Sequence, residues 1–191
     1  MEDLINKIKS RLELRPEAEE FLYSISKETH RFKGEVLIRE GQIVEKIFFV
    51  TSGCIRSYCV DKSGKEHTLL FAIKDWWISD YIAIHTNKLA TLTVECLTDS
   101  TIIEFNAKQL DQIHTLFPEF EPYQRHNLER HVVSLHQRIL NQLQLNASER
   151  YDLFLKQYPN IERHTRNYHI ASFLGITQES LSRIRVEKAK K

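Results

Sequence analysis

The alternation of apolar runs and turn residues predicts a β-rich first part of the chain. Between residues 30 and 105, short apolar runs recur at intervals of roughly eight to twelve residues, separated by turn sequences such as Ser52-Gly53. Short strands at this spacing are typical of a β-sandwich or barrel. Two short amphipathic helices are expected before the strands, over residues 4–12 and 16–25. The predicted strands are Val36–Ile38, Lys46–Thr51, Cys54–Val60, Glu66–Ile73, Thr91–Leu97 and Thr101–Phe105.

One long helix is predicted next, over about residues 118–145. This segment has no glycine, and no proline after Pro122. A 4-3-4 spacing of apolar residues, typical of a coiled-coil seam, is formed by Leu128, Val132, Leu135 and Ile139. Because so narrow a stripe buries little against its own domain, we expect a parallel partner helix and therefore a homodimer. Packing of the helix wholly inside one chain is the alternative.

The last part of the chain has the pattern of two helices joined by a glycine turn. One face of the first helix carries Ile170, Ala171 and Leu174. Gly175 follows at the position where a left-handed backbone costs glycine least, and Thr177 is a natural N-cap for the second helix. Leu181 and Ile184 point back to the core, which leaves an outer face of Gln178, Glu179, Ser182, Arg183 and Arg185. This arrangement is typical of a DNA-binding helix-turn-helix, although a helical hairpin with a solvated charged face would share it.

The distribution of charge supports the DNA-binding interpretation. The chain has 27 Lys and Arg against 26 Asp and Glu, a formal net charge of +1. Residues 146–191 hold nine basic and five acidic residues, a net +4, whereas the preceding residues hold 18 against 21, a net −3. Basic charge therefore concentrates where a surface would meet phosphates. Part of the excess belongs to Lys188, Lys190 and Lys191, which a solvated chain end would also explain.

Composition excludes several other classes of protein. With 41% hydrophobic and 28% charged residues, the chain reads as a globular protein, and no run approaches the ~20 apolar residues that span a bilayer. The first residues are acidic and lack the basic start and apolar core of a signal peptide, so we expect the cytoplasm. Cys54, Cys59 and Cys96 are odd in number and form no CxxC pair, which indicates reduced thiols.

These parts, in this order, resemble the Crp/Fnr family of bacterial transcription regulators. The resemblance is carried by FKGEVLIREG at residues 32–41, IFFVTSG at 47–53 and the helix-turn-helix at 170–185. It implies an α+β fold with a cyclic-nucleotide-binding-like β-roll (jelly roll), a long dimerisation helix and a C-terminal helix-turn-helix domain. The corresponding domains are residues 1–117, 118–145 and 146–191. The implied partners are a second copy of the chain, double-stranded DNA with a near-palindromic operator, and RNA polymerase.

The resemblance also implies roles for residues of the second helix. Thr177 falls where the family places a phosphate-contacting hydroxyl, and the three base-reading positions are occupied by Gln178, Glu179 and Arg183. Arginine can bind guanine O6 and N7, glutamate can accept from a cytosine amino group, and glutamine can pair with adenine. Gln178 replaces an arginine of the cyclic-AMP receptor, so we expect a different half-site. The family's wing is expected to be absent or truncated after this helix. The full predicted DNA-binding set is Thr177, Gln178, Glu179, Ser180, Ser182, Arg183 and Arg185.

The predicted sensor pocket departs from the family pattern. In members that bind cyclic AMP, a Gly-Glu pair holds the ribose and an Arg-Ser pair holds the cyclic phosphate; those positions here are Ser79-Asp80 and Ala90-Thr91. Because Ala90 cannot neutralise a phosphate, we expect no response to cyclic AMP. A different cyclic nucleotide or small-molecule effector in the roll is the alternative. Trp76 and Trp77 suggest a filled pocket or aromatic core packing. The candidate pocket residues are Ser79, Asp80, Ala90, Thr91, Leu135 and His136.

Other chemistry finds little support in the sequence. An oxygen sensor of this family would carry an N-terminal cysteine cluster, and residues 1–53 contain no cysteine. His126, His131 and His136 are five residues apart on the long helix and form no i, i+4 pair for a metal. A cupin-like metalloenzyme, the remote alternative, needs a His-x-His pair, but His67 has no such partner. We therefore expect no catalytic activity, no metal and no cofactor.

Overall fold

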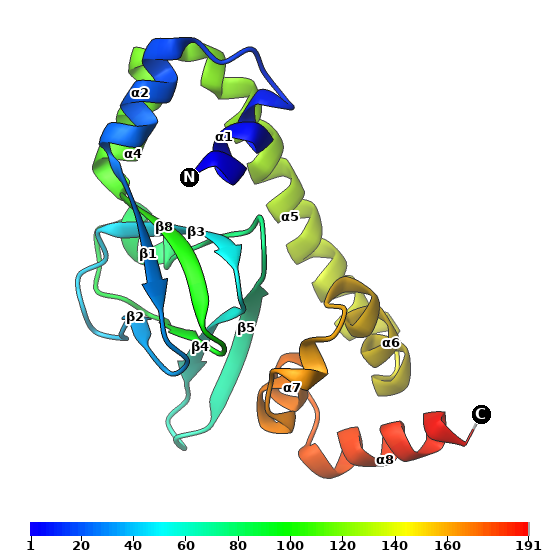
Figure 1. Cartoon of the computed structure of the whole chain (residues 1–191). Helices are drawn as coiled ribbons and strands as arrows, with labels where there is room; N and C mark the ends of the chain where they lie inside the picture. Colours follow the sequence, from blue (N-terminus) through cyan, green and yellow to red (C-terminus); the bar gives the residue numbers. More distant parts are fainter. Residues whose placement is uncertain (191) are drawn as a thin grey trace.

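A computed structural model describes residues 1–190 of the chain; Lys191, part of the predicted basic tail, lies outside the described residues. Eight strands form two four-stranded antiparallel sheets, in the orders β1-β8-β3-β6 and β2-β7-β4-β5, which make a β-roll (Figure 1). The strands are β1 (Ser26–Arg31), β2 (Val36–Ile38), β3 (Lys46–Ser52), β4 (Ile55–Val60), β5 (Glu66–Ala72), β6 (Trp77–Ile78), β7 (Thr93–Cys96) and β8 (Ser100–Asn106). The expected α+β fold with an N-terminal roll is confirmed.

The helices lie at both ends of the roll and along its side. α5, the longest, runs from the N-terminal helices to the C-terminal ones (Figure 1). The helices are α1 (Glu2–Lys9), α2 (Pro16–Ser24), α3 (Tyr81–Thr86), α4 (Ala107–Leu116), η1 (Pro118–Phe120), α5 (Glu121–Gln144), α6 (Ala147–Gln157), η2 (Ile161–Arg163), α7 (Asn167–Leu174) and α8 (Gln178–Ala189).

All six predicted strands are present, but the sequence pattern did not predict β1, β6 or α3. β1 reads Ser-Lys-Glu-Thr-His-Arg, with no apolar residue to mark it, and is held by its pairing with β8 from Ser26–Phe105 to Arg31–Ser100. β6 has two residues and α3 has six, so both are too short for a periodic signal. These elements are stabilised by residues that are distant in the sequence, so the local pattern of apolar and polar residues does not reveal them.

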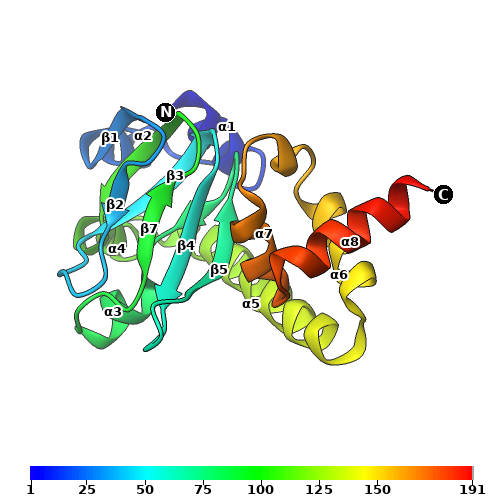
Figure 2. The same ribbon diagram turned by 90° about the horizontal axis from the view of Figure 1, so that it is seen from below.

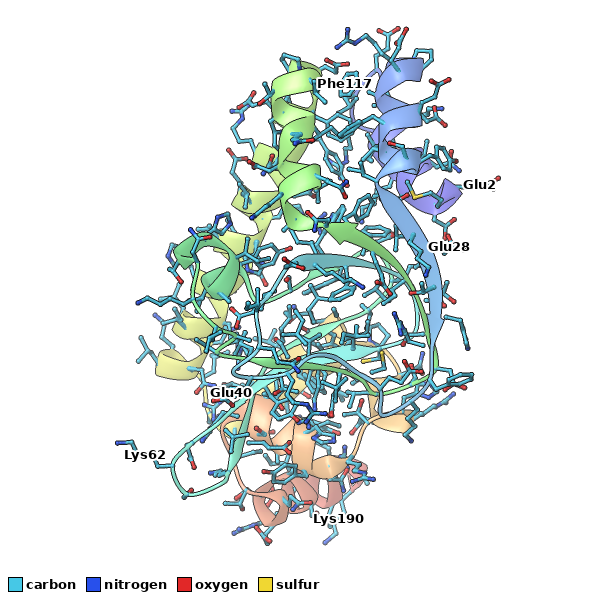
Figure 3. The ribbon with its side chains drawn as sticks, turned by 90° about the vertical axis from the view of Figure 1, so that its left-hand side faces the viewer. Glu2, Glu28, Glu40, Lys62, Phe117 and Lys190 are labelled. Carbon is cyan, nitrogen blue, oxygen red and sulfur yellow. The ribbon has the colours of Figure 1, made fainter. Side chains whose placement is uncertain are left out.

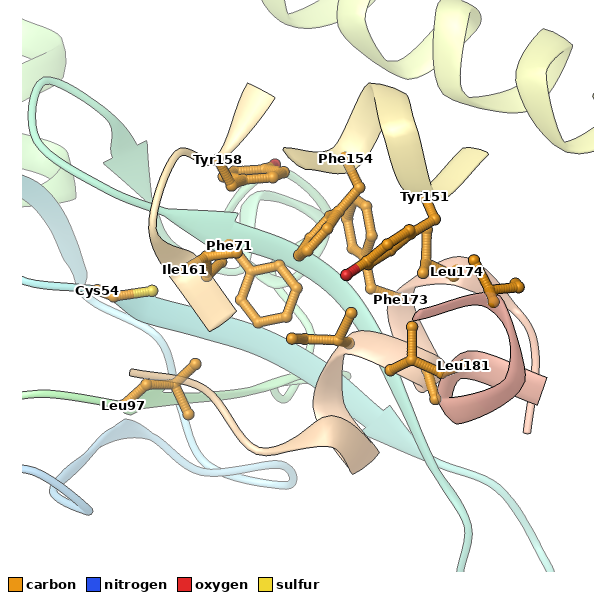
Figure 4. Close-up of a cluster of buried hydrophobic side chains, with 13 residues drawn as sticks. Cys54, Phe71, Leu97, Tyr151, Phe154, Tyr158, Ile161, Phe173, Leu174 and Leu181 are labelled. Atoms are coloured by element: carbon orange, nitrogen blue, oxygen red, sulfur yellow. The ribbon is translucent and has the colours of Figure 1, made fainter. Parts of the chain in front are cut away.

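Three hydrophobic clusters hold the elements together. The interior of the roll contains Phe48, Val50 and Ile102, whereas α1, α2, α4 and the start of α5 pack on its outer face around Phe49 and Phe105. The third cluster joins the roll to the C-terminal helices: Phe71 of β5 packs against residues of α6 and α7 (Figure 4). Its members are Cys54, Phe71, Leu97, Tyr151, Phe154, Tyr158, Ile161, Ile170, Ala171, Phe173, Leu174, Leu181 and Ile184.

The C-terminal helices dock on the free edge of a sheet. β5 is an edge strand, so its outward backbone groups lack a strand partner. Ser172 of α7 supplies one: its Oγ accepts from the N–H of Thr68 and donates to the carbonyl of Glu66, both at 2.8 Å. The hydroxyl of Tyr168 accepts from the N–H of Glu66 at 3.0 Å. Figure 2 shows α7 beside β5, and the β4–β5 hairpin protrudes with Lys62 near its tip in Figure 3.

Candidate nucleic-acid interface and sensor pocket

The turn between α7 and α8 has the geometry that the sequence predicts. Gly175 ends α7 in a left-handed conformation with φ +69°, and the N–H of Ile176 donates to the carbonyl of Ala171 at 3.0 Å. Thr177 is the N-cap of α8: its Oγ1 accepts from the backbone N–H of Ser180 at 3.2 Å. Leu181 and Ile184 are buried, which fixes the rotation of α8 about its axis.

The outer face of α8 is polar and open to solvent. Ser180 is half-buried beside the cap, and the exposed residues are Thr177, Gln178, Glu179, Ser182 and Arg183. Glu179 lies in the first turn, where hydrogen bonds from its own backbone N–H and from Thr177 lower the pKa of its carboxyl. Its carboxylate therefore stays charged and able to accept hydrogen bonds. The arrangement presents acceptors, amide groups and one guanidinium on a single helix face, the chemistry that reads base edges in a major groove.

Arg185 differs from the rest of the predicted DNA-binding set. Its Nε donates to the hydroxyl of Tyr151 at 3.1 Å and its Nη1 to Oδ1 of Asn167 at 2.5 Å. It also forms an ion pair with Glu162. These contacts join α8 to α6, α7 and the turn before α7, so Arg185 is half-buried inside the domain.

The docked position of the helix-turn-helix depends on residues that the sequence did not single out. Arg138 of α5 donates from Nη2 to the carbonyls of Thr68, at 3.2 Å, and Phe173, at 3.3 Å, and from Nη1 to that of Leu69. It thereby joins α5, β5 and α7. No local spacing marks this role, because Arg138 lies 35 residues from Phe173 and 70 from Thr68.

A buried ion-pair cluster lies beneath α7. Arg56 of β4 is 2% exposed and pairs with Glu66 and Glu95, each at 2.6 Å. His169 of α7 is 8% exposed and packs over this cluster, with Nδ1 3.9 Å from Oε2 of Glu66. Burial, together with the positive charges of Arg56 and Arg166, lowers the pKa of His169 to about 4, although Glu66 opposes the shift. His169 is therefore neutral near pH 7.

Two candidate pocket residues of the roll, Asp80 and Thr91, bond to each other. Asp80 is completely buried and N-caps α3 by accepting from the N–H of Ala83 at 3.0 Å. Its other oxygen accepts from the N–H and hydroxyl of Thr91, at 2.6 and 3.0 Å, and from the N–H of Leu92 at 3.0 Å. The hydroxyl of Ser79 donates to the carbonyl of Lys46 at 2.7 Å. The carboxylate that a ribose would need is thus already engaged within the chain.

The remaining candidate pocket residues lie in two places. Ala90 is buried, and its backbone bonds to the β2–β3 loop, with Gln42 accepting and Gly41 donating. Leu135 and His136 are exposed on α5. Both tryptophans contribute to aromatic packing: Trp77 lies 5.1 Å from Phe49 and 5.5 Å from Phe105, and Trp76 lies 5.9 Å from Tyr158 between ring centroids.

Within residues 1–190, no group of three or more His, Cys, Asp and Glu side chains is arranged to hold a metal ion. His67 bonds through Nε2 to Oδ2 of Asp61 at 2.7 Å in the β4–β5 hairpin, and His126 lies 3.2 Å from Nη1 of Arg11. None of the helices in this part of the chain is both long and apolar enough to cross a membrane.

Comparison with known proteins agrees with the fold and the order of its parts. The cyclic nucleotide-binding domain family matches residues 30–115, which include most of the roll. The transcriptional activator protein FnrA of Stutzerimonas stutzeri is 23% identical over 164 residues, which cover 80% of this chain. A crp/fnr-family structure from Eubacterium rectale superimposes with a TM-score of 0.73 at 18% identity, covering 93% of this chain and 85% of the other. Together, the matched domain, the relatives and the solved structures support a regulator of the Crp/Fnr family.

The similarity to these proteins is distant, and the lengths differ. The structure of FixK2 from Bradyrhizobium japonicum has a TM-score of 0.74 at 17% identity, covering 87% of this chain and 85% of that one. This likeness concerns the fold alone. The chain spans 66% of the length of FnrA and 64% of that of electron transport regulator A from Shewanella oneidensis. The matched 80% of this chain therefore corresponds to only about two thirds of these relatives.

Proposed function

We propose that this chain is a homodimeric, DNA-binding transcriptional regulator of Crp/Fnr type that does not respond to cyclic AMP. The observation that carries the proposal is the outer face of α8, where Gln178, Glu179 and Arg183 are exposed on a helix anchored by Leu181 and Ile184. Since the proposed binding partner is double-stranded DNA, the proposed compartment is the cytoplasm and no catalytic role is assigned. The names of the relatives, which include a transcriptional activator, support a role in transcriptional regulation.

The dimer is proposed to form along α5. The predicted seam residues are all solvent-exposed in the single chain, between 38 and 56%. They are Leu128, Val132, Leu135 and Ile139. Burial of this stripe in a parallel coiled coil would remove it from water and bring two recognition helices to half-sites one helical turn apart. The proposed division into a roll, residues 1–117, a dimer helix, 118–145, and a DNA-binding domain, 146–191, follows the same elements.

Loss of the cyclic-AMP response is proposed from the engaged carboxylate. Asp80 already accepts four hydrogen bonds from its own chain, and Ala90 offers no charge for a cyclic phosphate. A nucleotide would have to displace the contact between Asp80 and Thr91 before it could bind. Isothermal calorimetry with cyclic AMP and cyclic GMP tests this step, and saturable heat with either nucleotide would favour the alternative of a retained effector.

Selection of bound sequences from random DNA, with purified protein and no added ligand, tests the function. We expect a near-palindromic consensus. Arg183→Ala should then lower affinity for the consensus far more than for random DNA, because a bidentate contact to guanine contributes about 1–3 kcal/mol of discrimination. Lys188→Ala is the matched control: it removes one positive charge from the same helix, but this lysine pairs with Asp152 at 2.7 Å. No enrichment at low salt would contradict the proposal.

A further inference from the structure

The turn of the β4–β5 hairpin carries two lysines, Lys62 and Lys65, and both of these turn lysines are exposed. Gly64 has the left-handed φ, +82°, that a three-residue hairpin loop ending in glycine requires. The carboxylate of Asp61 closes the turn, because it accepts from the N–H of Ser63 at 2.8 Å and from that of Lys65 at 3.1 Å. The turn lysines are therefore carried on a well-defined, protruding backbone.

The acidic residues of the hairpin are engaged within the chain. Asp61 also accepts from the hydroxyl of Ser63 at 2.6 Å and bonds through Oδ2 to Nε2 of His67 at 2.7 Å. Glu66 pairs with buried Arg56 at 2.6 Å, beneath α7. Among the described residues, by contrast, neither turn lysine forms an ion pair. The positive charge at the tip of the hairpin is thus free to bind an anion.

The base of the hairpin is joined to the start of α7. The hydroxyl of Tyr168, in the first turn of α7, accepts from the N–H of Glu66 at 3.0 Å. One turn further along, Oγ of Ser172 bonds to the backbone of Glu66 and Thr68, both at 2.8 Å. Arg166 is the N-cap of α7 and is exposed, two residues before Tyr168. In the docked position, the hairpin and the start of α7 are therefore one connected unit.

The hairpin and α8 project from the same end of the molecule. Figure 1 shows the turn of the hairpin and α8 at the end opposite α2 and α4, and Figure 3 shows Lys62 protruding at that end. Figures 1 and 2 both place α7 between the hairpin and α8. Leu181 and Ile184 are buried against α6 and α7, so the polar face of α8 points outward at this end.

The geometry of helix-turn-helix binding determines what lies next to the hairpin. The second helix enters the major groove, and the first helix crosses the phosphate backbone. When α8 reads bases, α7 therefore lies over phosphates, and the hairpin bonded to its start lies beside the same backbone. We propose that the β4–β5 hairpin of the roll is a second DNA-binding element, in which Lys62 and Lys65 bind phosphates without reading sequence. This proposal rests on the proposed function.

Phosphate contacts make the affinity depend on salt, because each contact releases condensed counterions. On B-DNA, each contact contributes about 0.9 to the slope of log affinity against log salt, so the turn lysines of two subunits contribute about 3.6. Between 50 and 200 mM salt, this part of the slope corresponds to about a hundredfold in affinity. The contribution is the same for consensus and random DNA, because phosphates carry no sequence information directly.

Titration of DNA at three or more salt concentrations tests the hairpin contact. Lys62→Gln with Lys65→Gln should lose this part of the slope, and at low salt it should lose affinity for consensus and random duplexes by the same factor. Lys27→Gln with Lys108→Gln is the matched control, because it removes the same charge from exposed positions of β1 and α4 and should keep the native slope. A native slope in the hairpin variant would overturn the phosphate contact alone. If the native protein binds no DNA at low salt, the proposed function itself fails.

Affinity cleavage gives an independent readout, because it locates the hairpin on the DNA. Ser63→Cys in a Cys59→Ser background carries an iron chelate on the turn, since Cys54 and Cys96 are buried. When the chelate generates hydroxyl radicals, it should cut the consensus duplex at discrete positions related by the two-fold axis of the dimer. The same chelate at Gln109→Cys, exposed on α4, should give no localised cuts. Equal patterns from the two sites, or no cuts from the turn in a protein that binds the consensus, would contradict the proposal.

Discussion

The guanidinium of Arg138 in α5 stacks over the ring of Phe173 in α7, with its central carbon 4.3 Å from the ring centroid. The same guanidinium donates to the carbonyl of Phe173 and to two carbonyls of β5. One side chain thus connects the proposed dimer helix, the roll and the first helix of the helix-turn-helix. Any displacement of α7 from β5 has to break these contacts, so Arg138 holds the recognition helix in its docked position.

Arg138→Ala should therefore loosen the docking of the C-terminal helices. Hydrogen bonds to a charged group contribute roughly 1.5–3 kcal/mol each, and three are lost, although the freed carbonyls at the sheet edge gain water. We expect the free energy of unfolding in urea to fall by about 2 kcal/mol or more. Arg130→Ala is the control, because Arg130 is exposed on the same helix. Equal stability of the two variants would show that the contacts of Arg138 are dispensable.

The recognition helix could be predicted from sequence because its signals are local. Gly175 at the end of α7, Thr177 at the start of α8 and the buried pair Leu181 and Ile184 all lie within ten residues. The docking surface could not be predicted in this way. Ser172 lies 106 residues from its acceptor on Glu66, and no periodicity relates an α-helix to a distant sheet edge.

In the candidate pocket, the sequence predicted which residues lie together but not how they bond. Alignment to a family pattern places Asp80 and Thr91 as ligand residues, and the structure does bring them together. What the sequence does not contain is that they would bond to each other, because the path of the β6–α3 and α3–β7 loops depends on the whole roll. Arg185 is a similar case. Its position on the polar side of α8 is compatible with DNA contact, but in the structure its side chain bonds to Glu162 and Tyr151.

Asp80→Ala should lower the stability of the fold. The backbone N–H groups of Ala83, Thr91 and Leu92 would lose their acceptor, and each unsatisfied buried donor costs about 1–3 kcal/mol. We expect a loss of about 3 kcal/mol or more in urea unfolding. Asp80→Asn keeps one acceptor oxygen and should have an intermediate stability. Asp111→Ala, at an exposed position of α4, should change the stability little. Native stability of Asp80→Ala would instead indicate that the carboxylate is kept for a ligand.

The docked helix-turn-helix should lose stability in mild acid through His169. Its pKa of about 4 lies below the ordinary value of about 6.5, so the unfolded chain takes up the proton first as the pH falls. The stability associated with neutral His169 is complete above about pH 6.5 and is lost progressively down to about pH 4, by about 3 kcal/mol at most.

Urea unfolding at several pH values measures the contribution of His169. His169→Gln, which cannot be protonated, should flatten the slope between pH 6.5 and 4. His164→Gln is the control, because His164 is exposed in the same domain and should keep the native slope. If the His169→Gln variant keeps the native dependence of stability on pH, as the control does, the acid sensitivity has another origin.

Arg185→Ala should weaken DNA binding without changing its dependence on salt. Because Arg185 is engaged with Glu162, Tyr151 and Asn167, its loss should misplace α8 and lower affinity for consensus and random DNA alike. A lost phosphate contact would instead reduce the slope of log affinity against log salt by about one. Titrations at three or more salt concentrations distinguish these outcomes. Glu162→Gln, which changes no residue of α8, should give the same pattern at smaller amplitude. A reduced slope in Arg185→Ala alone would return this arginine to the DNA-contacting set.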